Sequence, residues 1–563
     1  MSLLSRLPNH LLLYCYSEWL GLKELGLLNV ALGKLEVNAN LICILADPAF
    51  SNTSYKLGTD AYNNVNPARH LEDALDWMAR MFGQSSRVAL EVILFPYHVY
   101  SLKNRRLQQG LTQQYHFVHK INFRILPLCN MECPSDSLFD EMMIWFPRLE
   151  TLSLTLLFNL LENQEYSLLS VLQSGRIQSF DLLYQTEYVD TAFVQLVGKY
   201  LRKLHFFQID CEELVEVLPS CQSLKWLDIY YFSDELERFE DVLEIVESFS
   251  LLESISVLKQ SYPQVSHGLG PEWFIDWKTA SLKHVDLHVF SCRAATIAML
   301  FEKYSVCLES VQFANFQWEA IRLSGFGALT LKHSHDLQRF ISEGEDFTQM
   351  ISLLSAIASL NVSMSSDIDV DPFCQEICSH EKFIMDLYDL SLNLEDSYAL
   401  KMVPSFHPLF ANLTVFKLNV CDDKVEGLSS YLESICIHLI DTAPNIKTLV
   451  IKTGHMLSPS KEICRRMLSE LTHLTHVSIS QVHNQLAFLN DLRDVSLATG
   501  RVFVCVDFPT CDLSRKDIVS ALETGWKVVR FVFHDKEIGW RPGGKTFRAY
   551  SPPVTAKVFM AAW

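Results

Sequence analysis

The stretch FPRLETLSLTL, residues Phe146–Leu156, decides the fold. It places Leu149, Leu152 and Leu154 in the frame L-x-x-L-x-L, directly after Pro147. A proline ends a preceding helix, and alternating apolar residues are typical of a short strand with one buried face. If the frame stands alone, it indicates one buried strand. If it returns at a regular spacing, it indicates one unit of an array.

The frame returns along most of the chain. An apolar residue occupies its first, fourth and sixth positions in these further strong copies: Ile177-Phe180-Leu182, Leu201-Leu204-Phe206, Leu224-Leu227-Ile229, Leu252-Ile255-Val257, Leu282-Val285-Leu287, Leu308-Val311-Phe313, Leu387-Leu390-Leu392, Leu413-Phe416-Leu418, Ile446-Leu449-Ile451 and Leu474-Val477-Ile479. Weaker copies are Val118-Ile121-Phe123, Phe326-Leu329-Leu331, Ile357-Leu360-Val362 and Val528-Phe531-Phe533. From Leu149 to Leu308 the copies follow one another at steps of 23 to 30 residues. Such a period indicates a solenoid of stacked units.

The segments between the copies have the spacing of helices. In DVLEIVESFSLLESISV, the side chains of Val242, Ile245 and Val246 fall on one helical face before the strand. Pro219 and Pro444 stand shortly before strands, where a proline ends a helix and lets the chain turn. Each unit is therefore predicted to be a helix, a turn and a short strand. Stacking buries the apolar face that one unit cannot bury alone.

With these repeats, residues 86–535 resemble the leucine-rich-repeat proteins of the ribonuclease-inhibitor-like kind. The resemblance implies an α/β solenoid, a horseshoe with parallel strands on its concave face and helices on its convex face. The family usually has an asparagine or cysteine three residues after the last apolar position of the frame. Four copies here have Leu157, Gln185, Ile209 and Phe232 at that place, and among the strong copies only Cys421 fits. The alternative is an ordinary α/β domain in which helices and strands alternate.

Residues 1–48 have a different pattern and resemble an F-box. The segment opens with Leu7-Pro8, continues into a helix ending in Trp19-Leu20, and has a second helix ending near Val30. The resemblance implies that these side chains pack against the Skp adaptor of a Skp–cullin–F-box ubiquitin ligase: Leu7, Pro8, Leu11, Leu22 and Leu25. The alternative is that the helices form a cap that closes the first repeat, since solenoids need such caps.

Two further segments complete the domain organisation. Residues 49–85 are predicted to be a loop and a linker helix, because FSNTSYKLGTDAYNNVNPAR is polar and rich in turn residues. The run VALEVILF that follows is expected to be the first strand. Residues 536–563 break the period and are expected to be a C-terminal cap or tail.

A candidate binding face follows from the frame. The residues between the apolar positions line the exposed side of the sheet, and neighbouring repeats stack equivalent positions about 5 Å apart. On this basis we expect Lys203, His205 and Phe207 to lie beside Trp226, Asp228 and Tyr230. The set continues two repeats later with His284, Asp286 and His288. Aromatic anchors mixed with charged groups are typical of protein-binding hot spots. The alternative is that Phe207 or Trp226 simply extends the core.

Composition and motifs argue against several classes of function. Lysine and arginine total 47 against 66 aspartate and glutamate, a net charge of −19, which argues against a nucleic-acid binder. No apolar run approaches the ~20 residues that span a bilayer. The chain has no P-loop, G-x-S-x-G or HExxH motif, so we expect no enzyme and no cofactor.

Two short motifs resemble metal sites only in part. DIDVD (Asp367, Asp369 and Asp371) begins like a calcium loop but lacks the central glycine, and Cys378 stands where the last glutamate would be. Cys374, Cys378 and His380 have no fourth zinc ligand at a standard distance. We therefore expect no metal. The 15 scattered cysteines favour reduced thiols in the cytoplasm or nucleus.

Two functions remain open from the sequence. The first is a substrate-recognition adaptor of a Skp–cullin–F-box type ubiquitin ligase, which would bind a Skp-type adaptor, a cullin and an unknown target protein. The second is a leucine-rich-repeat scaffold or inhibitor that has no ubiquitin role. Both are non-catalytic protein-interaction modules.

Overall fold

The structure, a computed structural model, describes a large part of the chain. The described residues are 55–57, 75, 90–94, 99, 114–125, 137–157, 160, 162–232, 239–260, 268–321, 327–354, 357–380, 386–420, 429–453, 459–479, 485–508, 528–533 and 536–539. They divide between two compact units. One unit comprises Met1–Val265 and Asp276–Leu282, and the other comprises Ser266–Ile275 and Lys283–Trp563.

The strands of the first unit form one parallel sheet in chain order. They are β1 (Tyr55–Leu57), β2 (Leu90–Leu94), β3 (Val118–Ile125), β4 (Thr151–Leu156), β5 (Ser179–Tyr184), β6 (Leu201–Ile209), β7 (Trp226–Phe232) and β8 (Ser254–Gln260). Each strand pairs in parallel with the next. The helices between them are α6 (Leu138–Trp145), α7 (Glu162–Gln173), α8 (Thr191–Val197), α9 (Cys211–Val217) and α10 (Phe239–Val246), with the short 3-10 helices η3 (Gly198–Tyr200) and η4 (Leu218–Ser220).

The second unit repeats this plan with two antiparallel exceptions. Its strands are β9 (Gly268–Leu269), β10 (His284–Leu287), β11 (Ser291–Cys292), β12 (Ser310–Phe313), β13 (Phe316–Ala320), β14 (Gly327–Leu331), β15 (Ile357–Met364), β16 (Asp389–Leu394), β17 (Val415–Val420), β18 (Thr448–Lys452), β19 (His476–Ile479), β20 (Phe503–Phe508), β21 (Val528–Phe533) and β22 (Lys536–Gly539). Strand β13 runs antiparallel between β12 and β14, and β22 runs antiparallel to β21.

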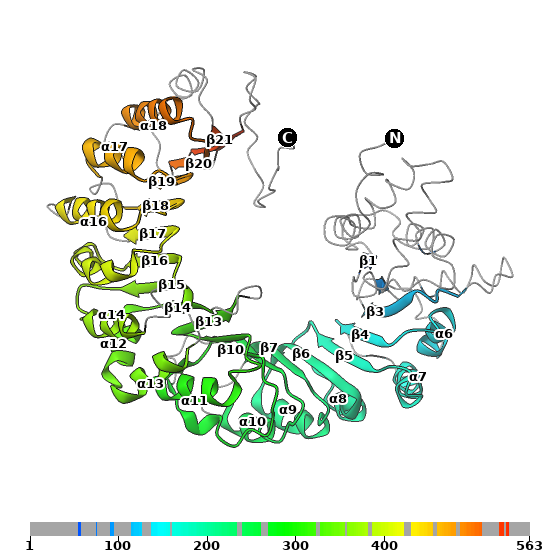
Figure 1. The fold of residues 1–563 in the computed structure, drawn as a ribbon. Helices are drawn as coiled ribbons and strands as arrows, with labels where there is room; N and C mark the ends of the chain where they lie inside the picture. The colour runs from blue at the N-terminus through cyan, green and yellow to red at the C-terminus, as the bar shows by residue number, and fades with distance from the viewer. Residues whose placement is uncertain are drawn as a thin grey trace, which may run out of the picture. The chain divides into compact units, whose positions relative to one another are not determined.

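The helices of the second unit stand between its parallel strands. They are η6 (Pro271–Trp273), α11 (Ala294–Tyr304), α12 (Ser334–Ser342), α13 (Glu345–Leu353), α14 (Asp371–Ser379), η7 (Ser397–Leu409), α16 (Ser429–Thr442), α17 (Lys461–Glu470) and α18 (Gln485–Thr499). In each unit the helices line one side of the strands (Figure 1). The predicted order of helix, turn and short strand is therefore confirmed for most units, and the described chain is a mixed α/β protein with a long, mostly parallel sheet.

The apolar frame forms the core, as its period predicts. All three frame residues of the copy at Leu201, Leu204 and Phe206 are fully buried. Equivalent positions pair across neighbouring strands, for example Leu204 with Leu227. The helix α9 between these two strands starts at a capping box, in which Asp210 and Glu213 each bond the backbone N–H of the other. This cap fixes the start of a helix that has only one or two turns.

Apolar side chains follow the frame in two neighbouring copies. At the place where leucine-rich repeats usually have asparagine or cysteine, Ile209 and Phe232 are 1% and 0% exposed. The ring of Phe232 meets that of Phe239 on α10 edge to face, with centroids 5.1 Å apart. Gln185 at the same place is exposed to solvent. At Ile209 and Phe232 this position is therefore part of the apolar core.

Three sequence-based expectations need correction. The polar stretch predicted to be a loop contains β1, whose Tyr55 pairs with Leu90, so β2 is not the first strand. The weak copy at Leu329 and Leu331 is reached through the antiparallel strand β13 instead of a helix. The pairing of β5 with β6 also departs from the frame by two residues. Leu182 pairs with Leu204, whereas its equivalent position in the frame is Phe206, and the register is irregular between Phe180 and Asp181.

Two predicted segments lie outside the described residues. They are residues 1–48 with the F-box-like side chains Leu7, Pro8, Leu11, Leu22 and Leu25, and the tail beyond residue 539. Within the described part of the chain, no helix combines the length and apolar character needed to cross a membrane.

Candidate protein-binding face

Strands β6 and β7 bring the first six candidate residues together. Lys203 pairs with Trp226 and His205 pairs with Asp228 in the parallel register. Because side chains alternate along a strand, the side chains between the buried frame residues point to the opposite face of the sheet. All six, Phe207 and Tyr230 included, are partly exposed.

The charged residues of this face are connected through Asp228. Its Oδ2 atom lies 2.6 Å from Nζ of Lys203 and 4.0 Å from Nδ1 of His205. Partial burial lowers the pKa of His205. The charge of Asp228 opposes this shift, and the charge of Lys203 adds to it. His205 is therefore largely neutral near pH 7, and the ion pair of the face is that between Lys203 and Asp228.

Asp181 of β5 belongs to the same face, and the frame did not reveal it. The register of β5 against β6 puts Asp181 beside Lys203. If equivalent frame positions were paired, Asp181 would lie beside His205. Its Oδ2 accepts a hydrogen bond of 2.8 Å from the hydroxyl of Ser153. Burial raises the pKa of Asp181, and the Ser153 hydrogen bond, Lys120 and Lys203 oppose that rise. The Asp181 carboxylate is thus hydrogen-bonded to Ser153 and lies near the positive charges of Lys120 and Lys203.

The aromatic residues form a compact group at the end of the two strands. The rings of Phe207 and Tyr230 stack with centroids 5.5 Å apart at 20°. The ring of Tyr231 stands edge-on to both, at 5.5 Å and 4.9 Å. Trp226 lies earlier on β7, with Nζ of Lys225 5.9 Å from its ring. Since Phe207 and Trp226 are both partly exposed, neither simply extends the core.

The remaining candidates, His284, Asp286 and His288, belong to the second unit. Nε2 of His288 lies 3.1 Å from Oδ1 of Asp286. Nδ1 of His284 is within 2.9 Å of the Ser310 hydroxyl. Partial burial and Lys332 lower the pKa of His288. These side chains therefore form a polar cluster of their own on β10 and its neighbour.

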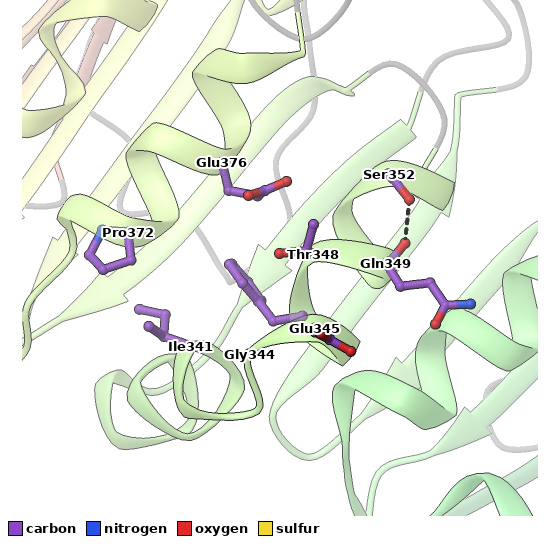
Figure 2. A pocket seen from close by; sticks show the side chains of 9 residues that line it. Ile341, Gly344, Glu345, Thr348, Gln349, Ser352, Pro372 and Glu376 are labelled. Carbon is purple, nitrogen blue, oxygen red and sulfur yellow. Dashed lines mark hydrogen bonds between the residues drawn. The ribbon is translucent and has the colours of Figure 1, made fainter.

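A shallow hollow of about 620 Å³ opens on the helix side of the second unit, between α13 and α14. Figure 2 shows the residues around it. The Ser352 hydroxyl donates to the Gln349 carbonyl, and Glu376 pairs with His380 at 3.4 Å. Two of the polar side chains are thus paired close by in the sequence, and the described residues around the hollow offer no set of convergent polar groups that would indicate a ligand site.

Metal binding and thiol chemistry would depend on histidine, cysteine and acidic side chains among the described residues. Within that part of the chain no group of three or more histidine, cysteine or acidic residues could hold a metal ion. Burial raises the pKa of Cys221 to about 11 and also raises that of Cys374 and Cys436. These thiols stay protonated, and a thiol is a poor nucleophile compared with a thiolate. What the face on β6 and β7 offers chemically is binding.

Comparison with protein-family models gives no match for this chain, and comparison with curated proteins gives none either.

Proposed function

We propose that the chain is a non-catalytic protein-interaction module, the substrate-recognition adaptor of a Skp–cullin–F-box type ubiquitin ligase. The described chain would be a leucine-rich-repeat solenoid whose exposed sheet face holds a target protein. The F-box-like segment, residues 1–48, would dock the Skp adaptor and through it the cullin. Such complexes act in the cytoplasm or nucleus, which agrees with the scattered cysteines and the acidic composition.

The observation that carries this proposal is the face on β6 and β7. It combines the stacked pair of Phe207 and Tyr230 with a half-buried ion pair of Lys203 and Asp228. Hot spots of protein interfaces are enriched in aromatic residues and in charged groups that a partner can desolvate. The helices of the described chain lie on one side of the sheet (Figure 1), and the six residues of this face lie on the other and are partly exposed.

The catalytic step would belong to the partners. An adaptor of this kind holds the target near a transfer enzyme, and proximity alone raises the effective concentration of the reacting groups.

The test uses the full chain and purified Skp adaptor in size-exclusion chromatography. We expect the wild-type chain to co-elute with the adaptor, and the Leu11→Glu/Leu22→Glu double variant to elute alone. Phe207→Ala is the matched control, because it alters the sheet face and should leave the complex intact. A folded wild-type chain that forms no complex overturns the ligase proposal. The alternative, a scaffold or inhibitor whose N-terminal helices are a cap, would then stand.

A further inference from the structure

The carboxylate of Asp228 meets two basic side chains on this face. Its Oδ2 atom faces both Lys203 and His205, and the Asp228 side chain is 22% exposed. Among the residues that the structure describes, its Oδ1 atom has no hydrogen-bond partner. A carboxylate oxygen of a partly buried side chain that accepts no hydrogen bond from the described residues is suited to accept a donor from a partner.

Aromatic side chains flank this oxygen on the same strand. Trp226 stands two residues before Asp228 and Tyr230 two residues after it, so all three point to the same face of β7. Phe207 on β6 stacks against Tyr230 and widens the aromatic surface. A ligand that contacts Asp228 on this face therefore has aromatic side chains on either side of it along β7.

The guanidinium of arginine fits both features. It is planar, stacks on aromatic faces and donates several N–H groups in a fixed fork, whereas the ammonium of lysine is compact and strongly hydrated. The net charge of −19 also attracts basic segments over a longer range. An anionic partner would meet Asp181 and Asp228 on this face and the repulsion of the whole chain.

We propose that the target presents an arginine to this face, with its guanidinium stacked on the aromatic residues and donating to Oδ1 of Asp228. The inference rests on the proposed function only in that the face binds a protein, and it does not depend on the Skp adaptor. Lys203 has a definite role here, because it competes for the same carboxylate. Removing its charge strengthens binding of an arginine and weakens binding of an anion.

The experiment displays three random peptide libraries that differ only in a fixed central residue, which is arginine, lysine or glutamine. The full chain selects from each library, and the affinities of the selected peptides are then measured. We expect the arginine library to yield the binders. Replacement of the central arginine by glutamine in the best peptide should weaken binding about tenfold, or about 1.4 kcal/mol.

Two substitutions in the protein complete the test. Asp228→Asn keeps the side-chain shape and should also weaken the best arginine peptide about tenfold. Lys203→Gln should strengthen it. Tyr398→Ala, at an exposed tyrosine of η7 in the second unit, is the control and should leave the affinity unchanged. If Asp228→Asn fails to fold, the direction of the Lys203→Gln effect still decides.

Several results would overturn the inference. They are selection of peptides without arginine, no enrichment in any library, equal binding to Asp228→Asn, or weaker binding to Lys203→Gln. The adaptor complex is measured separately on variants of Leu11 and Leu22. Loss of arginine preference with an intact adaptor complex therefore refutes this inference alone, and arginine binding without that complex refutes only the ligase proposal.

Discussion

Asn315 provides the sharpest test of how the second unit is held together. Its side chain is fully buried in the turn between β12 and β13. The Oδ1 atom accepts a hydrogen bond of 3.0 Å from the N–H of Cys292, and Nδ2 donates one of 3.0 Å to the carbonyl of the same residue. One amide side chain thus satisfies both backbone groups of a fully buried residue on β11.

Substituting Asn315→Leu removes both hydrogen bonds while nearly conserving the side-chain volume. Each buried backbone group left without a partner costs roughly 1–3 kcal/mol. Two such groups on Cys292 give an expected loss of about 2–6 kcal/mol. Asn315→Ala should cost more, because it adds a cavity to the same loss.

The assay is hydrogen–deuterium exchange of the peptides that cover residues 283–320, because an array of repeats opens locally and a single unfolding free energy is not well defined for it. A loss of about 2–6 kcal/mol corresponds to exchange that is faster by a factor of about thirty to about twenty thousand. Gln349→Leu is the control, since that amide is exposed and its replacement should change stability by less than ~0.5 kcal/mol. Unchanged exchange in Asn315→Leu would refute the reasoning.

Three further predictions concern other elements. Burial and the His438 ring 3.6 Å away lower the pKa of His407 from 6.5 to about 4, so the unfolded state binds its proton more tightly. Stability should fall as the pH is lowered from about 6.5 toward 4, and His407→Gln should flatten that slope in urea titrations at successive pH values. Gly344, at φ 60° and ψ −110°, is the N-cap residue of α13. Gly344→Ala should lower the free energy of unfolding by roughly 1–3 kcal/mol, measured by thermal unfolding. A melting curve identical to wild type would contradict this. Phe232→Asn supplies the residue usual in leucine-rich repeats but loses the contact with Phe239, so we expect a loss of roughly 3–5 kcal/mol, whereas a gain in stability would show that a ladder can form.

The sequence predicted the residue pairs of the β6 and β7 face that depend only on the spacing of the repeats. Two copies of the frame that follow each other at 23 residues must stack, so Lys203 was expected beside Trp226 and His205 beside Asp228, and both pairs are observed. The place of Asp181 could not be predicted. It depends on the register between β5 and β6, which is irregular. Such an irregularity changes the pairing without changing the apolar frame.

The hairpin of the second unit was unpredictable for a related reason. Its weak copy of the frame has the same pattern as an ordinary unit, yet β13 takes the place of a helix there. Trp318 of β13 fills the space, with its ring edge-on to Phe301 of α11 at 4.8 Å. A Cβ atom at Gly327 would lie 2.1 Å from Nε1 of Trp318, so the glycine permits the close approach. Such compensation between distant residues leaves no periodic signal.

Asn315 shows the same limit on a single side chain. It lies two residues after the last apolar position of its copy, whereas the family's ladder residue lies three after it. A search at the usual offset therefore finds Phe316 in its place. The observed role depends on the short strand β11, which brings Cys292 within reach.

The pattern of exposed side chains on the sheet face indicates how a partner segment would lie on it. Ser153 of β4 and Ser256 of β8 are small side chains that are only 5% and 9% exposed. The partly exposed side chains of Trp226, Asp228 and Tyr230 follow one another along β7 between these flanks. Two residues of extended chain span about 6.6 Å in any strand, so a partner segment running along β7 would keep its alternate side chains in step with these three. If its arginine faces Asp228, the residues two before and two after the arginine face the aromatic side chains. Apolar residues at those two positions would then distinguish the target from other basic segments.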